Sequence, residues 1–483
     1  MVLALACLVA FSFQGSRGLY ETTEGRYGEA GREMLETGNW WIPQLGYHPH
    51  LTKPPLTYWA IAAGIAVLGQ NEWGVRLYLA VASVFIVWAV YGIALVLWDS
   101  RTALFAGSLY ACAPAAVYGL SSVSTDEPLA LFELLMVLCY CHPWRGSGKA
   151  GLWRVGFWLS AGLGFMTKGP LPFLLLAALF VHNLFLRRKH LGAVSIFSGP
   201  GPWLGAIVGC SWFLVLLWRD PGLWSFFFGQ EVYGRVFTDQ HHRNPHWYGP
   251  VVVYLPVLLL GLGPAMLTWF WLPKKHPGKR LDKLILSHPT AALLTFWILI
   301  PLIVLSISRS RLPLYVLPLF PAVALATARA MQLWFDGPRM AILFKRYILA
   351  MVVLAILGKA AAAHLEVDAD SRRLSRFVRS GMSEDTFCFI FESDGLYGLD
   401  FYLGGRAERI HKSPPGSPGV TGAEEFRSEI AKHPNYRHAL FATDAKWATD
   451  RLRKLLQAEN LEVSETRQLG HYSTVLVALP ACR

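Results

Sequence analysis

Charged side chains are scarce in this chain. Asp, Glu, Lys and Arg make up 16% of its 483 residues, whereas a soluble globular protein carries about a quarter. Residues with hydrophobic side chains make up 54%. This balance excludes an ordinary soluble domain and indicates a protein of the membrane. The net charge of +12 lies in short basic clusters between apolar runs, as topology signals do, and this argues against a nucleic-acid partner.

Cysteine is also scarce. Five of the seven cysteines lie in or beside apolar runs, where they are expected to pack, namely Cys7, Cys112, Cys139, Cys141 and Cys210. Cys139 and Cys141 have no second pair, which disfavours a zinc site. Cys388 and Cys482 could pair only outside the cytoplasm. No Walker or dinucleotide-binding glycine pattern occurs, so nothing indicates a nucleotide-driven pump.

Long apolar runs predict about eleven transmembrane helices, each needing ~20 residues or a tilt to compensate. The clearer runs are Leu77 to Trp98, Ala103 to Val123, Leu129 to Cys141, Leu152 to Phe165, Leu171 to Leu186, Trp203 to Trp218, Val251 to Leu272, Ala291 to Ile307, Leu314 to Leu333 and Tyr347 to Ala363. Val2 to Phe13 is interpreted as the second half of a first span, because a basic region typical of a signal peptide is missing. Pro55 to Leu68 opens with two prolines and is expected to lie at the interface.

Basic loops predict the orientation. Clusters at 145–149, 187–190, 274–280 and 339–346 all fall between spans and are expected on the cytoplasmic side. Counting spans outward from them places four segments together on the opposite face: 14–76, 121–127, 219–248 and 308–313. We therefore predict a functional face outside the cytoplasm.

The first external loop is the most charged part of that face. Residues 21–58 hold five carboxylates and three basic side chains, namely Glu21, Glu24, Glu29, Glu33, Glu36, Arg26, Arg32 and Lys53. Residues 24–36 fit an amphipathic helix. So much charge beside a bilayer indicates a function.

Other candidates follow from the remaining outer turns. Asp126 lies at the start of a predicted helix, where a carboxylate serves either as a cap or as a catalytic group. Lys168, His242, Arg243 and Arg311 are candidates for binding a phosphate. Arg311 has an alternative role, which is to reach lipid headgroups.

Several motifs together resemble a known family. They are TEGRYGEAGREMLETGNWWIP with HLTKPPLTYW, TDEPLALF, MTKG, QHHRNPHWY and SRSRLPLYVLP, in order over about the first 335 residues. They resemble the bacterial aminoarabinose transferases of lipid A, which are grouped with the protein O-mannosyltransferases among the polyprenyl-phosphate-dependent GT-C glycosyltransferases. The resemblance implies an all-α polytopic membrane domain with interfacial helices in the first external loop. It also implies transfer of a sugar from undecaprenyl phosphate at the periplasmic face of the inner membrane.

The resemblance also implies roles for individual residues. Glu24 and Asp126 would be catalytic carboxylates. Substrate and phosphate would be bound by Arg26, Tyr27, Lys53, Tyr58, Lys168, His242, Arg243, Arg311 and Tyr315. Thr23 and Thr52 replace acidic residues of the family. In the aminoarabinose branch, the acidic residue at the position of Thr52 belongs to a metal site. No metal ligand is therefore carried over, and a divalent metal is disfavoured as a cofactor but stays an alternative. The catalytic carboxylate that Thr23 replaces has three alternatives in this chain: Glu24, Glu21, or Asp126 acting alone.

The chemistry needs few groups. A base takes the proton of the acceptor, and Lys or Arg neutralises the departing carrier phosphate without a metal. We expect inversion by a single displacement. The expected partners are a polyprenyl-phosphate-sugar donor, a lipid, glycan or protein acceptor, and the bilayer. A lipid or sugar transporter and a non-catalytic scaffold are the alternatives.

The last part of the chain is different in character. From Glu366 onward charge is frequent, and DTFCFIF, GLDFYLG, HALFAT and STVLVALP are predicted as strands, with helices at 423–433 and 445–458. We predict a transmembrane domain over 1–364 and a small periplasmic α/β domain over 365–483 with no site of its own.

Overall fold

The chain forms two compact units in a computed structural model. The first comprises Met1–Gln14, Leu51–Thr57 and Arg76–Lys359, and the second comprises Gly15–His50, Tyr58–Val75 and Ala360–Arg483. The structure describes residues 1–145, 149–191, 195–234, 237–238, 243–269, 288–334, 337–393, 395–410, 422–433 and 435–479. This division groups most of the first loop with the C-terminal residues, whereas the sequence-based division places that loop with the membrane domain.

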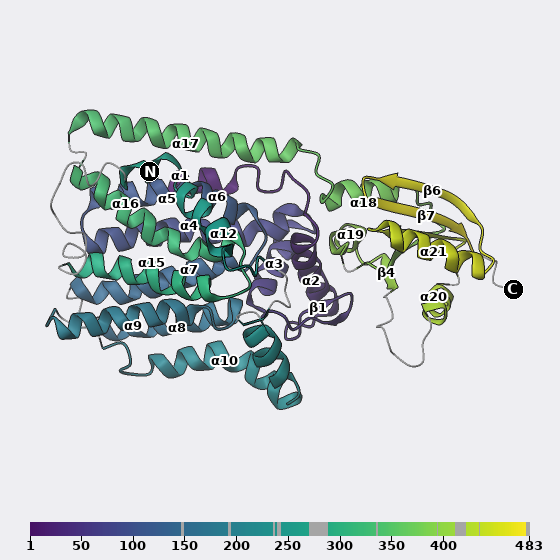
Figure 1. Cartoon of the computed structure of the whole chain (residues 1–483), viewed down its shortest axis with the longest axis horizontal. Helices are drawn as coiled ribbons and strands as arrows, with labels where there is room; N and C mark the ends of the chain where they lie inside the picture. Colours follow the sequence, from purple (N-terminus) through teal and green to yellow (C-terminus); the bar gives the residue numbers. More distant parts are fainter. Residues whose placement is uncertain are drawn as a thin grey trace. The chain divides into compact units, whose positions relative to one another are not determined.

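The first unit is helical (Figure 1). Its helices are α1 (Val2–Phe11), α5 (Ser100–Ala111), α6 (Pro114–Ser121), α7 (Asp126–Cys141), η1 (His142–Arg145), α8 (Ala150–Lys168), α9 (Pro172–Arg188), α10 (Gly201–Arg219), the π-helix η2 (Ser225–Gly234), α12 (Gly249–Leu260), η3 (Gly263–Leu267), α15 (Pro289–Ile307), η4 (Pro313–Leu319) and α16 (Phe320–Trp334). Three of the described helices have residues in both units, namely α3 (Leu56–Leu68), α4 (Glu72–Leu97) and α17 (Pro338–His364). Helices therefore occupy the described part of every predicted span.

In the described part of the chain, fewer helices than the predicted eleven are each long and apolar enough to cross a membrane. Among the described residues, five helices are long and apolar enough to cross a membrane, or up to six when the bent pair α5 and α6 counts as one. The helix α3 (Leu56–Leu68) is too short at 13 residues. The number of crossings and the interfacial position of α3 stay predictions.

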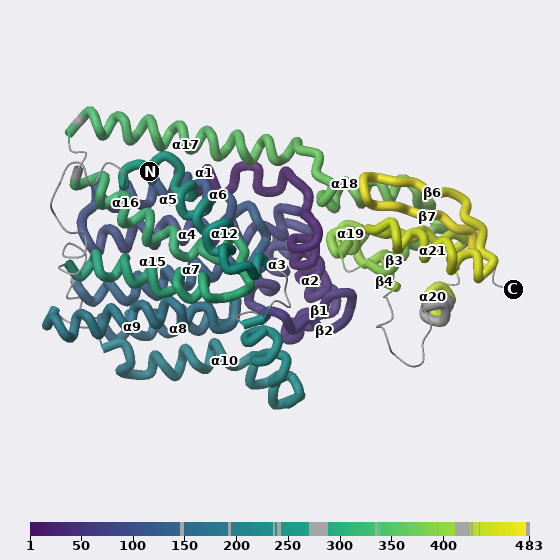
Figure 2. Tube along the Cα trace, in the orientation of Figure 1, coloured from purple at the N-terminus to yellow at the C-terminus, as the bar shows by residue number. Residues whose placement is uncertain are grey.

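Glycines let two helices of this unit approach closely. A Cβ on Gly162 of α8 would lie 2.5 Å from the carbonyl oxygen of Gly205 on α10, and one on Gly209 would lie 3.2 Å from the Cα of Gly162. Small residues at such positions are how helices pack in lipid, because their backbones can then make van der Waals contact. Gly205 and Gly209 are four residues apart, so both lie on the face of α10 that packs against α8. Figure 2 shows the two helices side by side.

The second unit contains a helix from the first loop and an α/β fold. The loop forms α2 (Thr23–Thr37) and a short hairpin of β1 (Gln44–Leu45) and β2 (His48–Pro49), followed by α3. The α/β part contains α18 (Ser371–Arg379), β3 (Thr386–Phe391), α19 (Tyr397–Leu403), β4 (Ala407–Ile410), α20 (Gly422–Ala431), β5 (His438–Thr443), α21 (Lys446–Ala458), β6 (Val463–Leu469) and β7 (Tyr472–Ala478). The expected helix in the first loop and the predicted small α/β fold are both present.

The sheet has the order β4-β3-β5-β7-β6, with β3 parallel to β4 and β5, and with β7 antiparallel to β5 and β6. Alternate residues of β3 enter two different cores, Phe387, Phe389 and Phe391 on one face and Cys388 and Ile390 on the other. Burial on both faces explains why the predicted strand is a continuous apolar run. Cys482, which could pair with Cys388 only outside the cytoplasm, lies outside the described residues.

One predicted strand is wrong. Residues 398–404 fall in the helix α19 and its C-cap, with Gly404 in the left-handed conformation at φ 68°. The aromatic residues of GLDFYLG favoured a strand. Leu396, Leu399 and Leu403 are nevertheless spaced three and four residues apart and share one core, which is the period of a helix.

Candidate active site

Four predicted site residues come together in the first unit. Asp126 begins α7 and pairs with Nζ of Lys168, the last residue of α8. The same ammonium lies 4.6 Å from the ring centroid of Tyr315 in η4, a cation–π contact. Nη1 of Arg243 donates to the Tyr315 hydroxyl at 3.1 Å. We call these residues, Asp126, Lys168, Tyr315 and Arg243, the polar row.

Two residues of the polar row lie at helix ends. Asp126 is the first residue of α7, where the helix dipole favours a carboxylate, and its backbone N–H donates to Ser124 Oγ at 3.2 Å. Lys168 lies at the C-terminus of α8, where a cation is favoured. The side chains of both are only 8% exposed. Two opposite charges so deeply buried must be paired, and they are.

A carboxylate of the same helix was missed by the sequence reasoning. Glu133 lies two turns after Asp126 on the same face of α7, is buried, and interacts electrostatically with Lys168. Its position seven residues from Asp126 was the available signal. Lys168 therefore faces negative charge from two positions of one helix.

Lys53 is paired separately within the same unit. Its Nζ lies 3.3 Å from Glu231 Oε2 and 2.8 Å from the Thr52 carbonyl oxygen. Glu231 belongs to η2. Nothing in the sequence pointed to Glu231, because the loop motif that carries the resemblance begins at Gln240, and so leaves η2 out.

Arg311 contacts backbone carbonyls. Its guanidinium donates to the carbonyl oxygens of Asn244, His246 and Ser306 at 2.8, 2.8 and 3.0 Å. The predicted phosphate role of Arg311 stays a prediction. His242 lies outside the described residues.

The remaining candidates belong to the second unit. Tyr27 of α2 stacks on Tyr58 of α3 at 5.4 Å between ring centroids, and Arg26 is half-buried in the same turn of α2. Both oxygens of Glu24 are held by Arg17 at 2.6 and 2.7 Å, and Oε2 also accepts from the Tyr20 N–H at 3.0 Å. Arg17 precedes the family motif, so the resemblance gave no reason to single it out.

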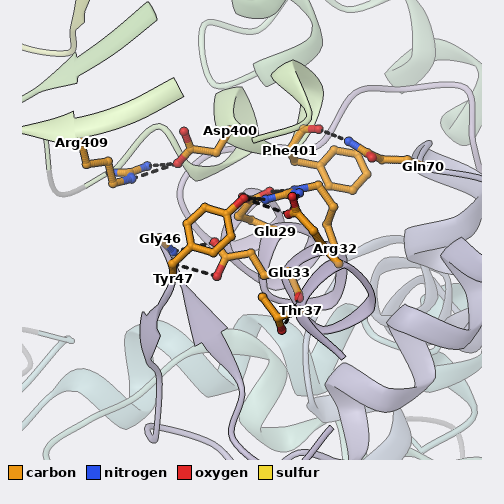
Figure 3. A network of polar contacts seen from close by, with 11 residues as sticks. Glu29, Arg32, Glu33, Thr37, Gly46, Tyr47, Gln70, Asp400, Phe401 and Arg409 are labelled. Carbon is orange, nitrogen blue, oxygen red and sulfur yellow. Dashed lines mark hydrogen bonds and ion pairs between the residues drawn. The ribbon is translucent and has the colours of Figure 1, made fainter. Parts of the chain in front are cut away.

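The other carboxylates of the first loop have structural partners, and Figure 3 shows those of Glu29 and Glu33. Arg32 donates to Glu29 at 2.8 and 2.7 Å and also pairs with Glu36. Glu33 accepts the N–H groups of Gly46 and Tyr47 at 2.6 and 2.9 Å, which ties the β1–β2 turn to α2. Glu21 accepts from Ser371 Oγ and from the Gly398 N–H at 2.8 and 2.7 Å. Most of the charge that suggested a function therefore serves the fold of this loop.

Burial changes the acidity of these groups. It raises the pKa of Glu33 to about 8, and the neighbouring charge of Glu29 acts in the same direction. Burial likewise raises the pKa of Glu21. Asp400, which pairs with Arg409 at 2.9 and 2.7 Å, has its pKa raised to about 7 by burial. None of these carboxyls belongs to the polar row.

The described residues do not bring three metal ligands together. No group of three His, Cys, Asp or Glu side chains within them has a suitable arrangement. Thr52, at the position of a family metal ligand, offers a neutral hydroxyl, which is a poor ligand for a divalent ion. We therefore derive no step through a metal.

Comparisons with known proteins agree with the motifs. Residues 52–218 match the family of dolichyl-phosphate-mannose-protein mannosyltransferases. The undecaprenyl phosphate-alpha-4-amino-4-deoxy-L-arabinose arabinosyl transferase 1 of Pseudomonas fluorescens is 31% identical over 329 residues, which are 66% of this chain and 55% of the relative. The corresponding transferase of Aeromonas hydrophila is 29% identical over 76% of this chain and 68% of its own length. This chain is a relative of the aminoarabinose transferases. It nevertheless spans little more than half of the Pseudomonas relative.

Solved structures show the same fold. ArnT from Cupriavidus metallidurans, bound to undecaprenyl phosphate, aligns with a TM-score of 0.72 at 19% identity, over 99% of this chain and 97% of that one. The Archaeoglobus fulgidus oligosaccharyltransferase aligns with a TM-score of 0.51 at 15% identity, over 91% and 68%. The expected GT-C fold, a helical membrane domain followed by a small C-terminal domain, is confirmed for this relative of the aminoarabinose transferases.

Proposed function

We propose that this chain is a membrane glycosyltransferase that moves a sugar from a polyprenyl-phosphate carrier to an acceptor at the periplasmic face of the inner membrane. The polar row is the observation that carries the proposal. It places a carboxylate, an ammonium, a phenol and a guanidinium in one continuous series within the helical unit. These are the groups that a phosphate leaving group and an acceptor proton require.

The roles divide by charge. Lys168 and Arg243 both contact Tyr315 and supply positive charge and hydrogen-bond donors for a phosphate. Lys53, of the same unit, supplies a third cation. Asp126 is the base that accepts the proton of the acceptor, and it forms an ion pair with Lys168.

Glu24 is less suited to act as the base. Arg17 holds both of its oxygens, so a proton transfer to Glu24 would first have to break a bidentate pair. We therefore assign Glu24 to the structure of the first loop and Asp126 to the reaction. The reaction is a single displacement in which the bond from the anomeric carbon to the phosphate oxygen breaks as the acceptor oxygen bonds, with inversion.

A transporter is the alternative from another class. It requires ionisable groups near the middle of its spans. Of the three charged side chains that interact here, Glu133 lies within α7, whereas Asp126 starts α7 and Lys168 ends α8. This placement favours a transferase.

The test is turnover of undecaprenyl-phosphate-linked sugars by the purified full chain with membrane lipids as acceptors. Asp126→Asn is expected to lower kcat at least about 100-fold, as loss of a general base does. The exposed Glu384→Gln is the matched control and is expected to retain full turnover. Full turnover by Asp126→Asn would overturn the assignment of the base, and a covalent glycosyl-enzyme would overturn the single displacement.

A further inference from the structure

Arg311 joins two outer segments of the helical unit. Its guanidinium donates to three backbone carbonyls, two in the segment 244–246 and one at Ser306. The whole residue is buried, with 4% of its surface exposed. An arginine at a lipid headgroup or in a ligand site directs its donors outward, whereas three donors of Arg311 end on the chain itself.

The backbones of the two segments are also joined. The Arg311 N–H donates to the Arg243 carbonyl oxygen at 2.8 Å, and Asn244 Nδ2 donates to the Arg311 carbonyl oxygen at 3.1 Å. Asn244 has φ 52°, a left-handed conformation that Asn adopts more readily than most residues. A Cβ on Gly249 would lie 2.5 Å from Arg311 Nη1 and 2.6 Å from the Asn244 carbonyl oxygen, so the close fit needs glycine there. We call this set of hydrogen bonds the Arg311 clamp.

The clamp ends at the polar row. Arg243 accepts the backbone bond from Arg311 and directs its own side chain to the Tyr315 hydroxyl at 3.1 Å. Tyr315 follows Arg311 by four residues, so both partners of the Arg243–Tyr315 bond are fixed by the same segment. We propose that Arg311 is a positioning residue, which holds the 243–246 segment so that the Arg243 guanidinium is directed to the carrier phosphate. This inference rests on the proposed function.

The physical reason is preorganisation. An arginine on an unrestrained loop loses conformational entropy when it binds a phosphate, and the loss weakens binding. A clamp formed before the ligand arrives removes this cost from the binding step. Lysine cannot replace Arg311, because its single ammonium lacks the planar fork that reaches carbonyls on two segments.

The test is a double-mutant cycle on binding of undecaprenyl phosphate to the full chain in lipid nanodiscs. Arg243→Gln and Arg311→Gln are each expected to weaken binding about tenfold. The first removes the charged donor to the phosphate, and the second releases the segment that directs this donor. The double variant is expected to bind no more weakly than Arg243→Gln alone, because the clamp acts through Arg243. Arg311→Lys is expected to resemble Arg311→Gln. Arg309→Gln removes the same charge from an exposed position of the same turn and is expected to bind like the wild type.

The outcomes separate the two proposals. Unchanged binding by Arg243→Gln would overturn the phosphate site of the proposed function. Weakened binding by Arg243→Gln with unchanged binding by Arg311→Gln would overturn the clamp alone. Full additivity in the double variant would also overturn it, since a purely structural or direct role predicts additivity. If Arg311→Gln does not fold, Asn244→Gly keeps the left-handed backbone and removes one clamp bond. It is expected to weaken binding two- to threefold in the wild-type background, and an equal effect in the Arg243→Gln background would overturn the clamp.

Discussion

Lys53 Nζ and Glu231 Oε2 lie 3.3 Å apart, so the lysine proposed to bind a phosphate already has a carboxylate beside it. The side chains are 17% and 16% exposed. A phosphate that reaches Lys53 must compete with this carboxylate and also meets its negative charge. Glu231 is therefore expected to oppose the proposed binding of the carrier phosphate.

The variant Glu231→Gln is expected to bind undecaprenyl phosphate about three- to tenfold more tightly, because it removes a repulsion worth about 1 kcal/mol in a partly exposed site. The effect should shrink as salt screens it. Binding to the purified chain in nanodiscs at two salt concentrations measures both. Asp220→Asn, an exposed acidic residue that starts the same loop and bonds the Gly222 N–H at 2.9 Å, is the control. Equal or weaker binding by Glu231→Gln would show that Lys53 is not a phosphate ligand in competition with it.

Variants of the Asp126–Lys168 pair are expected to affect stability and turnover differently. Lys168→Met leaves Asp126 buried beside Glu133 without its cation and is expected to cost about 3–5 kcal/mol of stability. Asp126→Leu combined with Lys168→Met replaces the pair with apolar groups and is expected to recover most of that stability while turnover stays lost. Unfolding in detergent and turnover, measured on the same preparations, check this. A double variant that recovers turnover as well would mean that the pair is only structural.

Glu33 predicts a pH dependence. Its pKa in the folded chain is about 8, above the ordinary value of 4.5, so the folded chain binds more protons between these limits. Stability contributed by the protonated group is fully present below pH 4.5 and is lost as pH rises through about 8. The loss amounts to a few kcal/mol, at 1.36 kcal/mol per pKa unit and allowing for solvent screening.

Glu33→Gln should flatten this dependence between pH 4.5 and 8, because the amide stays neutral throughout. The midpoint of thermal unfolding across this pH range provides the measurement. Glu36→Gln is the matched control on the same helix, since its pKa is lowered by Arg32 and it does not titrate in that range. Equal slopes for Glu33→Gln and the wild type would refute the prediction.

The sequence predicted the parts of this molecule that depend on local pattern. Long apolar runs predicted the helices, and short apolar runs predicted β3, β5 and β7. The motifs predicted Asp126, Lys168, Arg243 and Tyr315, which do come together. The partners Arg17 and Glu231 could not be predicted. Each lies outside the motifs, and their pairing depends on where a loop folds back, which no periodicity encodes. The same reason explains why the five carboxylates of the first loop suggested chemistry, while the structure gives most of them backbone or arginine partners.

The helix α19 shows that β-strand propensity alone does not determine the secondary structure of a segment. Its aromatic residues favour a strand, but Gly404 and Gly405, both with positive φ, stop the chain after two turns and return it to β4. Asp400 on that helix pairs with Arg409 of β4, a contact nine residues apart that only this return allows. Tertiary contacts therefore overrode the local preference.

The packing of α8 on α10 predicts the effect of one methyl group. Gly205→Ala would place a Cβ 2.4 Å from the Trp158 carbonyl oxygen, a backbone atom that cannot move away cheaply. The two helices must separate, and the variant is expected to lose about 1–3 kcal/mol, as overpacked sites do. Gly358→Ala is the control, because its Cβ on α17 would meet nothing within 4 Å and alanine favours a helix by up to ~1 kcal/mol over glycine. Thermal unfolding in one detergent compares the two. Since α8 ends at Lys168, Gly205→Ala should also lower turnover, whereas an unaffected rate would show that the polar row tolerates a shift of this helix.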